Sequence, residues 1–321
     1  MKTLALMTSG GDAPGMNAAI RAVTRAAVGS GFRVLGFQRG YDGILEEQYQ
    51  ELDARSVSNI VQRGGTILKT ARSSEFLRTR GLVKAAAVLN KTGVDALVVI
   101  GGDGTFRGAM DLAGFWKGRI IGVPGTIDND LAGTDFTIGF DTAVNTAVEA
   151  IDKIRDTAAA HERFFLVEVM GRRCGQIALE VGIAGGAEEI LIPENPEDIR
   201  RIARRLCAGR DGGKSSSIIV VAEGVKGGAL EAARQLKRLT RNEYRVAILG
   251  YIQRGGNPTA ADRCLATRLG VRAVEALLQG ETGKMAGEVG GRGVLAPFHV
   301  AVKGKRQVDR LYPRLMKFLN L

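Results

Sequence analysis

The chain has 321 residues, and 45 Lys and Arg against 34 Asp and Glu give a formal net charge of +11 with both histidines neutral. At roughly 100–200 residues per domain, this length predicts two domains or one large one. A hydrophobic share of 45% with 25% charged residues excludes intrinsic disorder of the whole chain. Apolar runs stay far below the roughly 18 residues that a membrane-spanning helix needs, so we expect no membrane partner.

The residues usable for metal binding and for nucleophilic catalysis are few. Cys174, Cys207 and Cys264 form no CxxC pair, which predicts free thiols in a reducing compartment. No leader-like segment opens the chain, so we expect a cytoplasmic protein. With His161 and His299 as the two histidines, a Ser-His-Asp triad is not expected. Catalysis should therefore rest on carboxylates, basic side chains and backbone groups.

Short β-branched runs alternate with amphipathic stretches along the chain, which is typical of parallel α/β sheets. The expected strands are, in chain order, Thr3–Met7, Arg33–Phe37, Ala96–Ile100, Ile120–Val123, Phe164–Val169, Glu189–Ile192, Ile218–Ala222 and Val246–Leu249. The expected helices include Met16–Val28, Thr142–Thr157, Asp198–Ala208, Leu230–Thr240 and Ala260–Leu278. Ligands bind at the carboxyl ends of such strands, and the glycine-rich segments fall there.

The first glycine-rich segment, Thr8–Asn17, ends a strand and opens a helix. Gly10 and Gly11 allow backbone N–H groups to approach a phosphate closely, and the helix N-terminus adds a favourable potential. This arrangement indicates a nucleotide site. The alternative is an ordinary tight turn in which Asp12 caps the helix.

The second segment, Ile100–Thr105, again lies between an apolar strand and a helix. Asp103 beside flexible glycines can reach a magnesium ion held by a triphosphate, which makes it the metal candidate. The Gly-Gly-Asp-Gly-Thr motif also occurs in kinases that phosphorylate NAD or lipids. By itself it therefore indicates a kinase-like protein, or an Asp in an ordinary turn.

The third segment, Pro124–Asp130, carries two carboxylates separated by one residue. One of Asp128 and Asp130 can act as general base on an attacking hydroxyl, while the other orients that hydroxyl or assists a metal. Thr126 can donate to the transferring phosphoryl group. Asp-Asn-Asp is also a favourable turn sequence, which is the structural alternative.

The basic residues do not form one stripe with interleaved aromatics, and aromatics make up 5% of the chain. This distribution favours small polyanions over nucleic acid as ligands. Gly213-Lys214-Ser215 resembles the end of a P-loop, but Ala208 stands where that motif requires glycine. We therefore reject a P-loop there.

Together with Glu168–Arg172 and Ile252–Gly256, these segments resemble the 6-phosphofructokinase family over essentially the whole chain. The resemblance implies a glycolytic kinase that transfers the ATP γ-phosphoryl group, with Mg²⁺, to the 1-hydroxyl of fructose 6-phosphate, giving fructose 1,6-bisphosphate and ADP. It also implies two Rossmann-like three-layer domains with parallel sheets and the active site in the cleft between them. Residues 1–139 with 252–303 would bind ATP, and residues 140–251 with 304–321 would bind fructose 6-phosphate.

The resemblance implies roles for single residues and a homotetramer with shared active sites. In catalysis it implies Asp128 as general base, with Thr126, Asp130, Arg72 and Arg172 beside it. For ATP it implies Gly11, Arg72, Ser73, Gly102, Asp103, Gly104 and Thr105, with Asp103 on the metal. For fructose 6-phosphate it implies Thr126, Ile127, Asp128, Met170, Gly171, Arg172, Glu223, Tyr251 and Arg254, with Arg163 and Arg245 from a neighbouring subunit. For an effector, ADP or phosphoenolpyruvate, it implies Arg21, Arg25, Arg155, Gly186, Glu188 and Lys214.

Two positions bear on the phosphoryl donor. Pyrophosphate-using relatives typically carry Asp where this chain has Gly104 and Lys where it has Gly125, so both glycines favour ATP. The chain departs from the family at Tyr251, where a His is common, and at Ser73, which replaces an aromatic residue. A pyrophosphate-dependent enzyme of the same fold and a non-catalytic, nucleotide-sensing subunit remain the alternatives.

Overall fold

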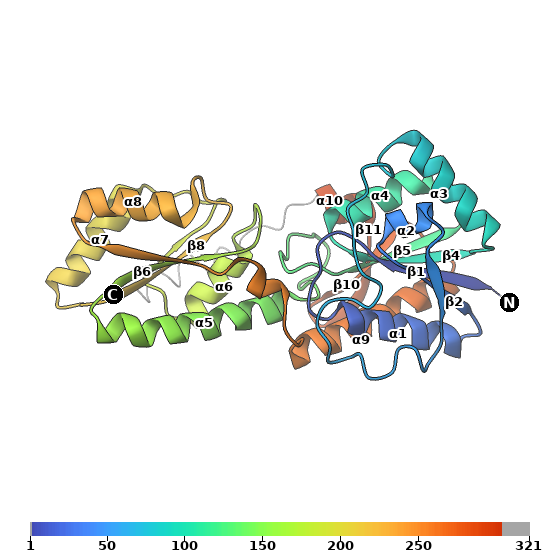
Figure 1. Cartoon of the computed structure of the whole chain (residues 1–321), viewed down its shortest axis with the longest axis horizontal. Coiled ribbons are helices and arrows are strands. Elements are labelled where there is room, and N and C mark those ends of the chain that lie inside the picture. The colour runs from blue at the N-terminus through green and yellow to red at the C-terminus, as the bar shows by residue number, and fades with distance from the viewer. Residues whose placement is uncertain (1, 304–321) are drawn as a thin grey trace. The chain divides into compact units, whose positions relative to one another are not determined.

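The computed structural model describes residues 2–303, which form two compact units. The first unit comprises residues 2–142 and 254–303, and the second comprises residues 143–253. The segment 304–321, which the sequence assigned to a sugar-phosphate domain, lies outside the described residues. Each unit has a β-sheet with helices on both faces, and each is described by itself below (Figure 1).

The sheet of the first unit has the strand order β11-β10-β5-β4-β1-β2-β3. Its strands are β1 (Thr3–Thr8), β2 (Arg33–Phe37), β3 (Tyr49–Leu52), β4 (Ala96–Gly101), β5 (Arg119–Pro124), β10 (Lys284–Val289) and β11 (Arg292–Pro297). The expected parallel pairing is confirmed from β10 to β2, whereas β3 and β11 pair antiparallel at the two edges. Strands β1 and β4 are buried along their whole length, which explains their continuous apolar sequences.

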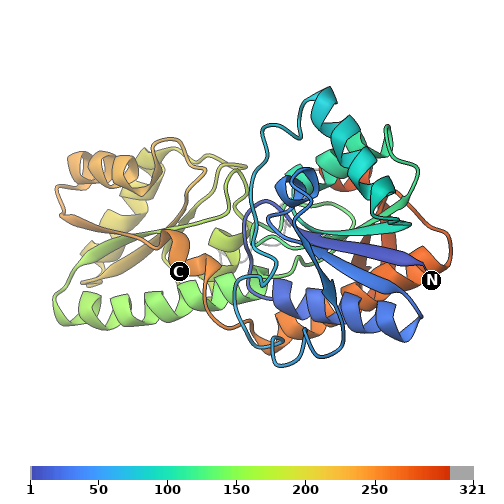
Figure 2. The ribbon, with the colours of Figure 1, turned by 45° about the vertical axis from the view of Figure 1, so that its right-hand side comes forward.

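Helices cover both faces of this first sheet. Helices α1 (Met16–Gly29) and α9 (Ala260–Leu278) pack together on one face, as Figures 1 and 2 show. The other face carries α2 (Tyr41–Leu45), α3 (Thr79–Lys91), α4 (Asp103–Ala113) and α10 (Phe298–Lys303). Buried side chains from these helices and from one face of β1, β2 and β4 form a single core cluster.

The second unit has a fully parallel sheet of strand order β7-β8-β6-β9. Its strands are β6 (Phe164–Val169), β7 (Glu189–Leu191), β8 (Ser217–Ala222) and β9 (Tyr244–Ile248). Helices α7 (Ile199–Asp211) and α8 (Gly228–Thr240) cover one face and share a core with the strands. Helices α5 (Phe140–Ala160), which begins in the first unit, and α6 (Gln176–Ala184) lie on the other face, and the short 3₁₀ helix η1 (Gly250–Arg254) follows β9.

Each of the expected strands and helices is present, with ends that differ by a few residues. The largest strand shift is in β9, which begins at Tyr244 and not at Val246. Helix α7 begins one residue after Asp198, because the Asp198 carboxylate caps it by accepting from the Arg200 N–H.

The cysteines are free thiols, with Cys174 buried and Cys264 exposed. Between residues 2 and 303, no helix is long and apolar enough to cross a membrane.

Candidate active site

The three glycine-rich segments lie side by side at the carboxyl ends of central strands of the first sheet. They follow β1, β4 and β5, which are neighbouring parallel strands. The Ser9 N–H donates to the Ile100 carbonyl and the Gly125 N–H donates to the Gly101 carbonyl, both at 3.0 Å. In the sheet, β2 lies on one side of β1 and β4 on the other, so the order in which the chain adds strands changes direction between β1 and β4. Open α/β sheets bind ligands at such a topological switch point.

Close packing between the first two segments requires glycine at position 101. A Cβ there would lie 2.3 Å from the Thr105 Oγ1 and 2.5 Å from the Ser9 carbonyl oxygen. The Thr105 hydroxyl donates to that same Ser9 carbonyl at 3.0 Å, and the Tyr41 hydroxyl donates to the Thr105 carbonyl. Thr105, expected at the ATP site, thus uses its side chain to join the first two glycine-rich turns.

Asn17 holds the segment that leads to Arg72 and Ser73. Its buried amide donates to the carbonyls of Arg63 and Gly64 and accepts from the Ile67 N–H. Farther along, the Thr70 hydroxyl donates to the Gly10 carbonyl at 2.8 Å. The Thr70 bond holds the chain at the first glycine-rich turn, two residues before the exposed Arg72 and three before the half-buried Ser73. The sequence interpretation did not identify this function of Asn17.

Asp103 lies in the first turn of α4, where its carboxylate is partly exposed, 3.9 Å from the Arg107 guanidinium. Residues 2–303 contain no group of three His, Cys, Asp or Glu side chains that could hold a metal ion. Mg²⁺ in kinases is often held by one or two carboxylates together with the substrate phosphates, and Asp103 fits this arrangement. At the next position, a Cβ on Gly104 would meet no atom within 4 Å.

The loop after β5 carries Asp128, whose side chain is 2% exposed. Asn129 adopts the left-handed conformation (φ 50°), and its side-chain oxygen accepts from the Thr137 N–H at 3.0 Å. The Thr137 hydroxyl donates to the Thr126 carbonyl at 2.6 Å, and the Asp128 N–H donates to the Thr126 hydroxyl at 3.2 Å. The backbone on both sides of Asp128 is therefore fixed by Asn129 and Thr137. Sequence reasoning did not assign these roles.

Two other expected residues of this loop differ in exposure. Ile127 is fully buried, so its side chain belongs to the core and its backbone alone can face a ligand. The Asp130 side chain is partly exposed.

Asp262 joins the end of this loop to the start of α9. The side chain is 1% exposed and accepts from the Gly139 N–H, the Thr142 N–H and the Thr142 hydroxyl. Burial raises the pKa of its carboxyl, and these donors oppose the shift. Asp262 is missing from the expected site residues, although the Thr259-to-Asp262 spacing is typical of a helix start, and the Thr259 hydroxyl accepts from the Asp262 N–H.

Arg254 lies at the first glycine-rich turn, where its guanidinium donates to the Asp12 carbonyl at 3.0 Å. Asp12 is not the helix cap that the structural alternative required. The N-cap of α1 is Gly15, in a left-handed conformation and with no side-chain hydrogen bond.

In the second unit, the Met170–Arg172 turn and Glu223 follow the neighbouring strands β6 and β8. The Glu223 N–H donates to the Val169 carbonyl, which sets the two segments side by side. The Glu223 carboxylate accepts from the N–H groups of Gly171 and Arg172, at 3.2 and 2.6 Å. The backbone of Arg172 is in the left-handed region (φ 55°), which most residues avoid. The Glu223 carboxylate stabilises the turn in this conformation.

Gln253 also stabilises the Met170–Arg172 turn, and the sequence analysis did not identify it. Its fully buried side chain accepts from the Met170 N–H at 2.8 Å and donates to the Ala143 carbonyl. Two residues earlier, Tyr251 is 84% exposed. The Ile-Gln-Arg-Gly-Gly motif therefore contains one structural residue, Gln253, beside the expected ligand residue Arg254.

Within one chain, Arg163 and Arg245 lie far from Met170, Arg172 and Glu223. Both lie at the amino ends of the paired strands β6 and β9, whereas Met170, Arg172 and Glu223 follow the carboxyl ends. The length of β6 separates the two groups by about 20 Å at about 3.3 Å per residue.

The structure brings together four of the expected effector residues in the second unit. The Glu188 carboxylate lies 3.1 Å from the Lys214 ammonium and 4.0 Å from the Arg155 guanidinium. Arg155 also donates to the carbonyl of Gly186 at 2.7 Å. Arg21 and Arg25 lie on α1 in the first unit.

Comparison with known proteins identifies the family. The sequence model described as Phosphofructokinase matches residues 3–277. The chain belongs to the phosphofructokinase family. It is 56% identical over 322 residues to "ATP-dependent 6-phosphofructokinase 1" of Thermus thermophilus, covering 100% of both chains, and 56% identical over 287 residues to the protein of that name from Clostridium perfringens, covering 89% of both.

Solved structures of phosphofructokinases share this fold. The phosphofructokinase of Saccharomyces cerevisiae matches 100% of this chain with a TM-score of 0.87 and 36% identity, and this chain spans 47% of the yeast chain. A pyrophosphate-dependent phosphofructokinase from Marinobacter aquaeolei matches 97% of this chain at 25% identity, with a TM-score of 0.84 and 86% of that chain covered. The expected α/β fold is confirmed by these similarities and by the two sheets.

Proposed function

We propose that this phosphofructokinase transfers the γ-phosphoryl group of ATP to the 1-hydroxyl of fructose 6-phosphate, giving fructose 1,6-bisphosphate and ADP. The observation that carries the proposal is full-length similarity, at 56% identity, to a relative named as an ATP-dependent 6-phosphofructokinase. The juxtaposition of the three glycine-rich segments at one sheet edge supports it, because such turns bind phosphates.

Asp128 is the proposed general base. Its carboxylate removes the proton of the 1-hydroxyl as the hydroxyl oxygen attacks the γ-phosphorus and the bond from that phosphorus to the ADP oxygen breaks. Burial of Asp128 in a loop fixed by Asn129 and Thr137 supports this role, since a general base needs a constant position. Thr126 and Asp130 are the proposed neighbours that orient the phosphoryl group and the hydroxyl.

The first unit is the proposed nucleotide-binding part. The backbone at Gly11 and at Gly102–Thr105 would hold the phosphates, with Ser73 nearby and with Arg72 offsetting charge on the transferring group. Asp103 would hold Mg²⁺, which neutralises charge on the phosphates when it is bound. The partial exposure of Asp103 and the absence of a larger acidic cluster in residues 2–303 fit a metal that is shared with the substrate.

Fructose 6-phosphate is the proposed ligand of Met170, Gly171, Arg172, Glu223, Tyr251 and Arg254. Arg163 and Arg245 lie at the other end of the second sheet, which supports the proposal that they serve the site of a neighbouring copy. A homotetramer with shared sites follows as the proposed assembly. Arg155, Gly186, Glu188 and Lys214, with Arg21 and Arg25, form the proposed site for ADP or phosphoenolpyruvate.

The donor assignment is tested by a coupled assay with fructose 6-phosphate and magnesium, run in parallel with ATP and with pyrophosphate. We expect turnover with ATP alone. In Gly104→Asp, the new carboxylate would occupy open space where the ATP phosphates are proposed to lie, so kcat/KM for ATP should fall about 10- to 100-fold, about 1.4–2.7 kcal/mol. An acidic residue in the first turn of α4 is favourable to the helix, so folding should be retained.

Gly104→Ala is the matched control, because it adds a side chain without charge and should change kcat/KM for ATP less than threefold. Turnover of the wild-type chain with pyrophosphate alone contradicts the donor assignment. Silence with both donors supports the nucleotide-sensing alternative. If kcat/KM for ATP is the same in Gly104→Asp as in the wild type, Gly104 does not determine the choice of ATP as donor.

Glu223 has two separable functions, since its carboxylate holds the Arg172 turn and is proposed to accept sugar hydroxyls. Glu223→Gln keeps an acceptor oxygen for the turn but loses the charge. We expect its KM for fructose 6-phosphate to rise about tenfold with a melting temperature near wild type, because hydrogen bonds to charged groups contribute about 1.5–3 kcal/mol. Glu223→Ala should raise KM and lower the melting temperature together. Equal KM values for Glu223→Gln and the wild type would show that the carboxylate serves the turn alone.

A further inference from the structure

The buried amide of Gln253 joins two segments of the second unit. Its Oε1 accepts from the Met170 N–H at 2.8 Å, and its Nε2 donates to the Ala143 carbonyl at 3.2 Å. The side chain is 0% exposed, so water cannot replace either partner. Because a backbone N–H can only donate and a carbonyl can only accept, these two groups also fix which end of the amide is the oxygen.

This pair of partners requires an uncharged amide at position 253. An amide offers an acceptor and a donor on one side chain, and it carries no charge that burial would penalise. An apolar side chain of similar length would leave the Met170 N–H and the Ala143 carbonyl unsatisfied. An ionised Glu would set a second acceptor against the Ala143 carbonyl. Both hydrogen bonds therefore depend on the chemical type of this residue.

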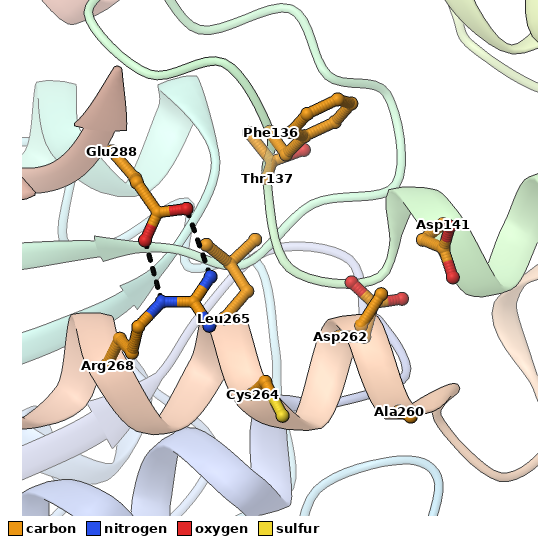
Figure 3. A pocket seen from close by; sticks show the side chains of 10 residues that line it. Phe136, Thr137, Asp141, Ala260, Asp262, Cys264, Leu265, Arg268 and Glu288 are labelled. Atoms are coloured by element: carbon orange, nitrogen blue, oxygen red, sulfur yellow. Dashed lines mark hydrogen bonds and ion pairs between the residues drawn. The ribbon is translucent and has the colours of Figure 1, made fainter. Parts of the chain in front are cut away.

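The Ala143 carbonyl belongs to a part of the chain that is itself held in place. One residue earlier, Thr142 donates to the buried Asp262 carboxylate through both its N–H and its hydroxyl. Figure 3 shows Asp262 beside the start of α5. Gln253 thus connects Met170 to a fixed point at the start of this helix.

Each backbone N–H of the 170–172 turn donates to a side chain. Met170 donates to Gln253, whereas Gly171 and Arg172 donate to the Glu223 carboxylate. The left-handed backbone of Arg172 needs these acceptors to keep its conformation. Without the Gln253 oxygen, the buried Met170 N–H has to find another partner, and the neighbouring groups of the turn move with it.

We propose that Gln253 is a positioning residue that sets the affinity for fructose 6-phosphate without touching the sugar. The inference rests on the proposed function, because Met170, Gly171, Arg172 and Glu223 are its proposed ligand residues. Gln253 acts through the turn, so its loss weakens the ground-state and the transition-state complexes alike. Such a loss raises KM for fructose 6-phosphate and leaves kcat nearly unchanged.

The test compares Gln253→Met with the matched control Gln235→Met. Gln235 lies in α8 of the same unit, and its amide donates to Glu231 of the same helix. Gln253→Met should raise KM for fructose 6-phosphate about tenfold, because a buried donor and a buried acceptor lose their partners. Its kcat and its KM for ATP should change less than about threefold. Gln235→Met should leave all three values near those of the wild type.

Gln253→Glu keeps the size of the side chain and the acceptor for the Met170 N–H. Its protonated carboxyl can also donate to the Ala143 carbonyl, whereas its carboxylate cannot. Since burial raises the pKa of a carboxyl, KM for fructose 6-phosphate relative to the wild type should be near one at about pH 6 and about tenfold higher at about pH 9. The charged groups of the neighbouring segments are the same in both proteins, namely Asp141, Glu168, Arg172, Glu223, Arg254 and Asp262.

Calorimetric titration with fructose 6-phosphate in the absence of ATP separates this inference from the proposed reaction. The Kd should rise about tenfold in Gln253→Met, whether or not the wild type transfers a phosphoryl group. Wild-type binding without turnover overturns the reaction and not the role of Gln253, and a wild type that does not bind the sugar phosphate overturns both.

Two further results would overturn the positioning role. One is an equal Kd in the wild type and in Gln253→Met, and the other is an equal rise in KM for both substrates. Circular dichroism identifies a Gln253→Met protein that fails to fold, and the pH dependence of Gln253→Glu then decides. A KM ratio for Gln253→Glu that does not rise with pH contradicts the proposal.

Discussion

Asp128→Asn should lower kcat by about 10²- to 10⁴-fold, the usual contribution of a general base, while KM for both substrates changes little. The amide has nearly the size and shape of the carboxylate but cannot take the proton of the attacking hydroxyl. The loop around it should persist, because the Asn129 side chain and the Thr137 hydroxyl and N–H anchor it through hydrogen bonds that do not involve the Asp128 side chain. Steady-state kinetics with binding measurements for each substrate check the result.

Asp130→Asn is the control for Asp128→Asn, since it removes a carboxylate two residues away in the same loop. Asp130 is partly exposed and its proposed role is to orient the hydroxyl, so the loss in kcat should be smaller than in Asp128→Asn. Near-normal turnover of Asp128→Asn would show that another group removes the proton. A larger loss in Asp130→Asn would exchange the two roles.

Asp262→Ala should lower the free energy of unfolding of the first unit by about 3–5 kcal/mol, because each buried donor left without an acceptor costs about 1–3 kcal/mol. The substitution leaves the Gly139 N–H, the Thr142 N–H and the Thr142 hydroxyl without their acceptor in a site that is 1% exposed. The buried Trp116 is the one tryptophan of the chain and lies in the first unit. Its fluorescence during urea unfolding therefore reports the affected unit.

The conservative variant Asp262→Asn separates the hydrogen bonds from the charge. Burial raises the pKa of Asp262 above its ordinary 3.8, so the folded state binds this proton more tightly than the unfolded state does. The corresponding stability is fully present below that ordinary pKa and is lost as the pH rises through the folded pKa. Stability of the wild type relative to Asp262→Asn should therefore fall as the pH rises through this window. A constant or rising difference would contradict the direction of the shift, and an Asp262→Ala protein as stable as the wild type would contradict the anchoring role.

Local patterns were sufficient to predict the secondary structure around the site. Strands β1 and β4 are apolar throughout because both of their faces are buried, and each is followed by glycines and a helix. The residue types after these strands also indicated the chemistry, since Asp103 and Asp128 stand where parallel strands expose their loops. Such signals lie within about ten residues of each other, and a single sequence contains them.

The outer strands of the first sheet, β3 on one side and β10 with β11 on the other, could not be predicted in the same way. Strand β3, Tyr-Gln-Glu-Leu, is short and mostly exposed, so it lacks the apolar run that marks β1. Strand β10 joins the sheet through Lys284 opposite Ile121, a pairing between segments more than 150 residues apart. Nothing in either local sequence specifies that partner.

The amino-acid sequence by itself determined the strand-turn-helix pattern, the glycine-rich turns and the candidate acids and arginines, because these depend on local conformational preference and hydrophobic spacing. The tertiary structure decided which of them meet. The fold brings Asp262 into hydrogen-bond contact with Thr142, 120 residues away, and Gln253 into contact with the Met170 N–H. It also places Arg163 and Arg172 at opposite ends of one strand. The physical reason is that a buried polar group must find its hydrogen-bond partner wherever the folded chain brings one, and distance along the chain does not reveal that partner.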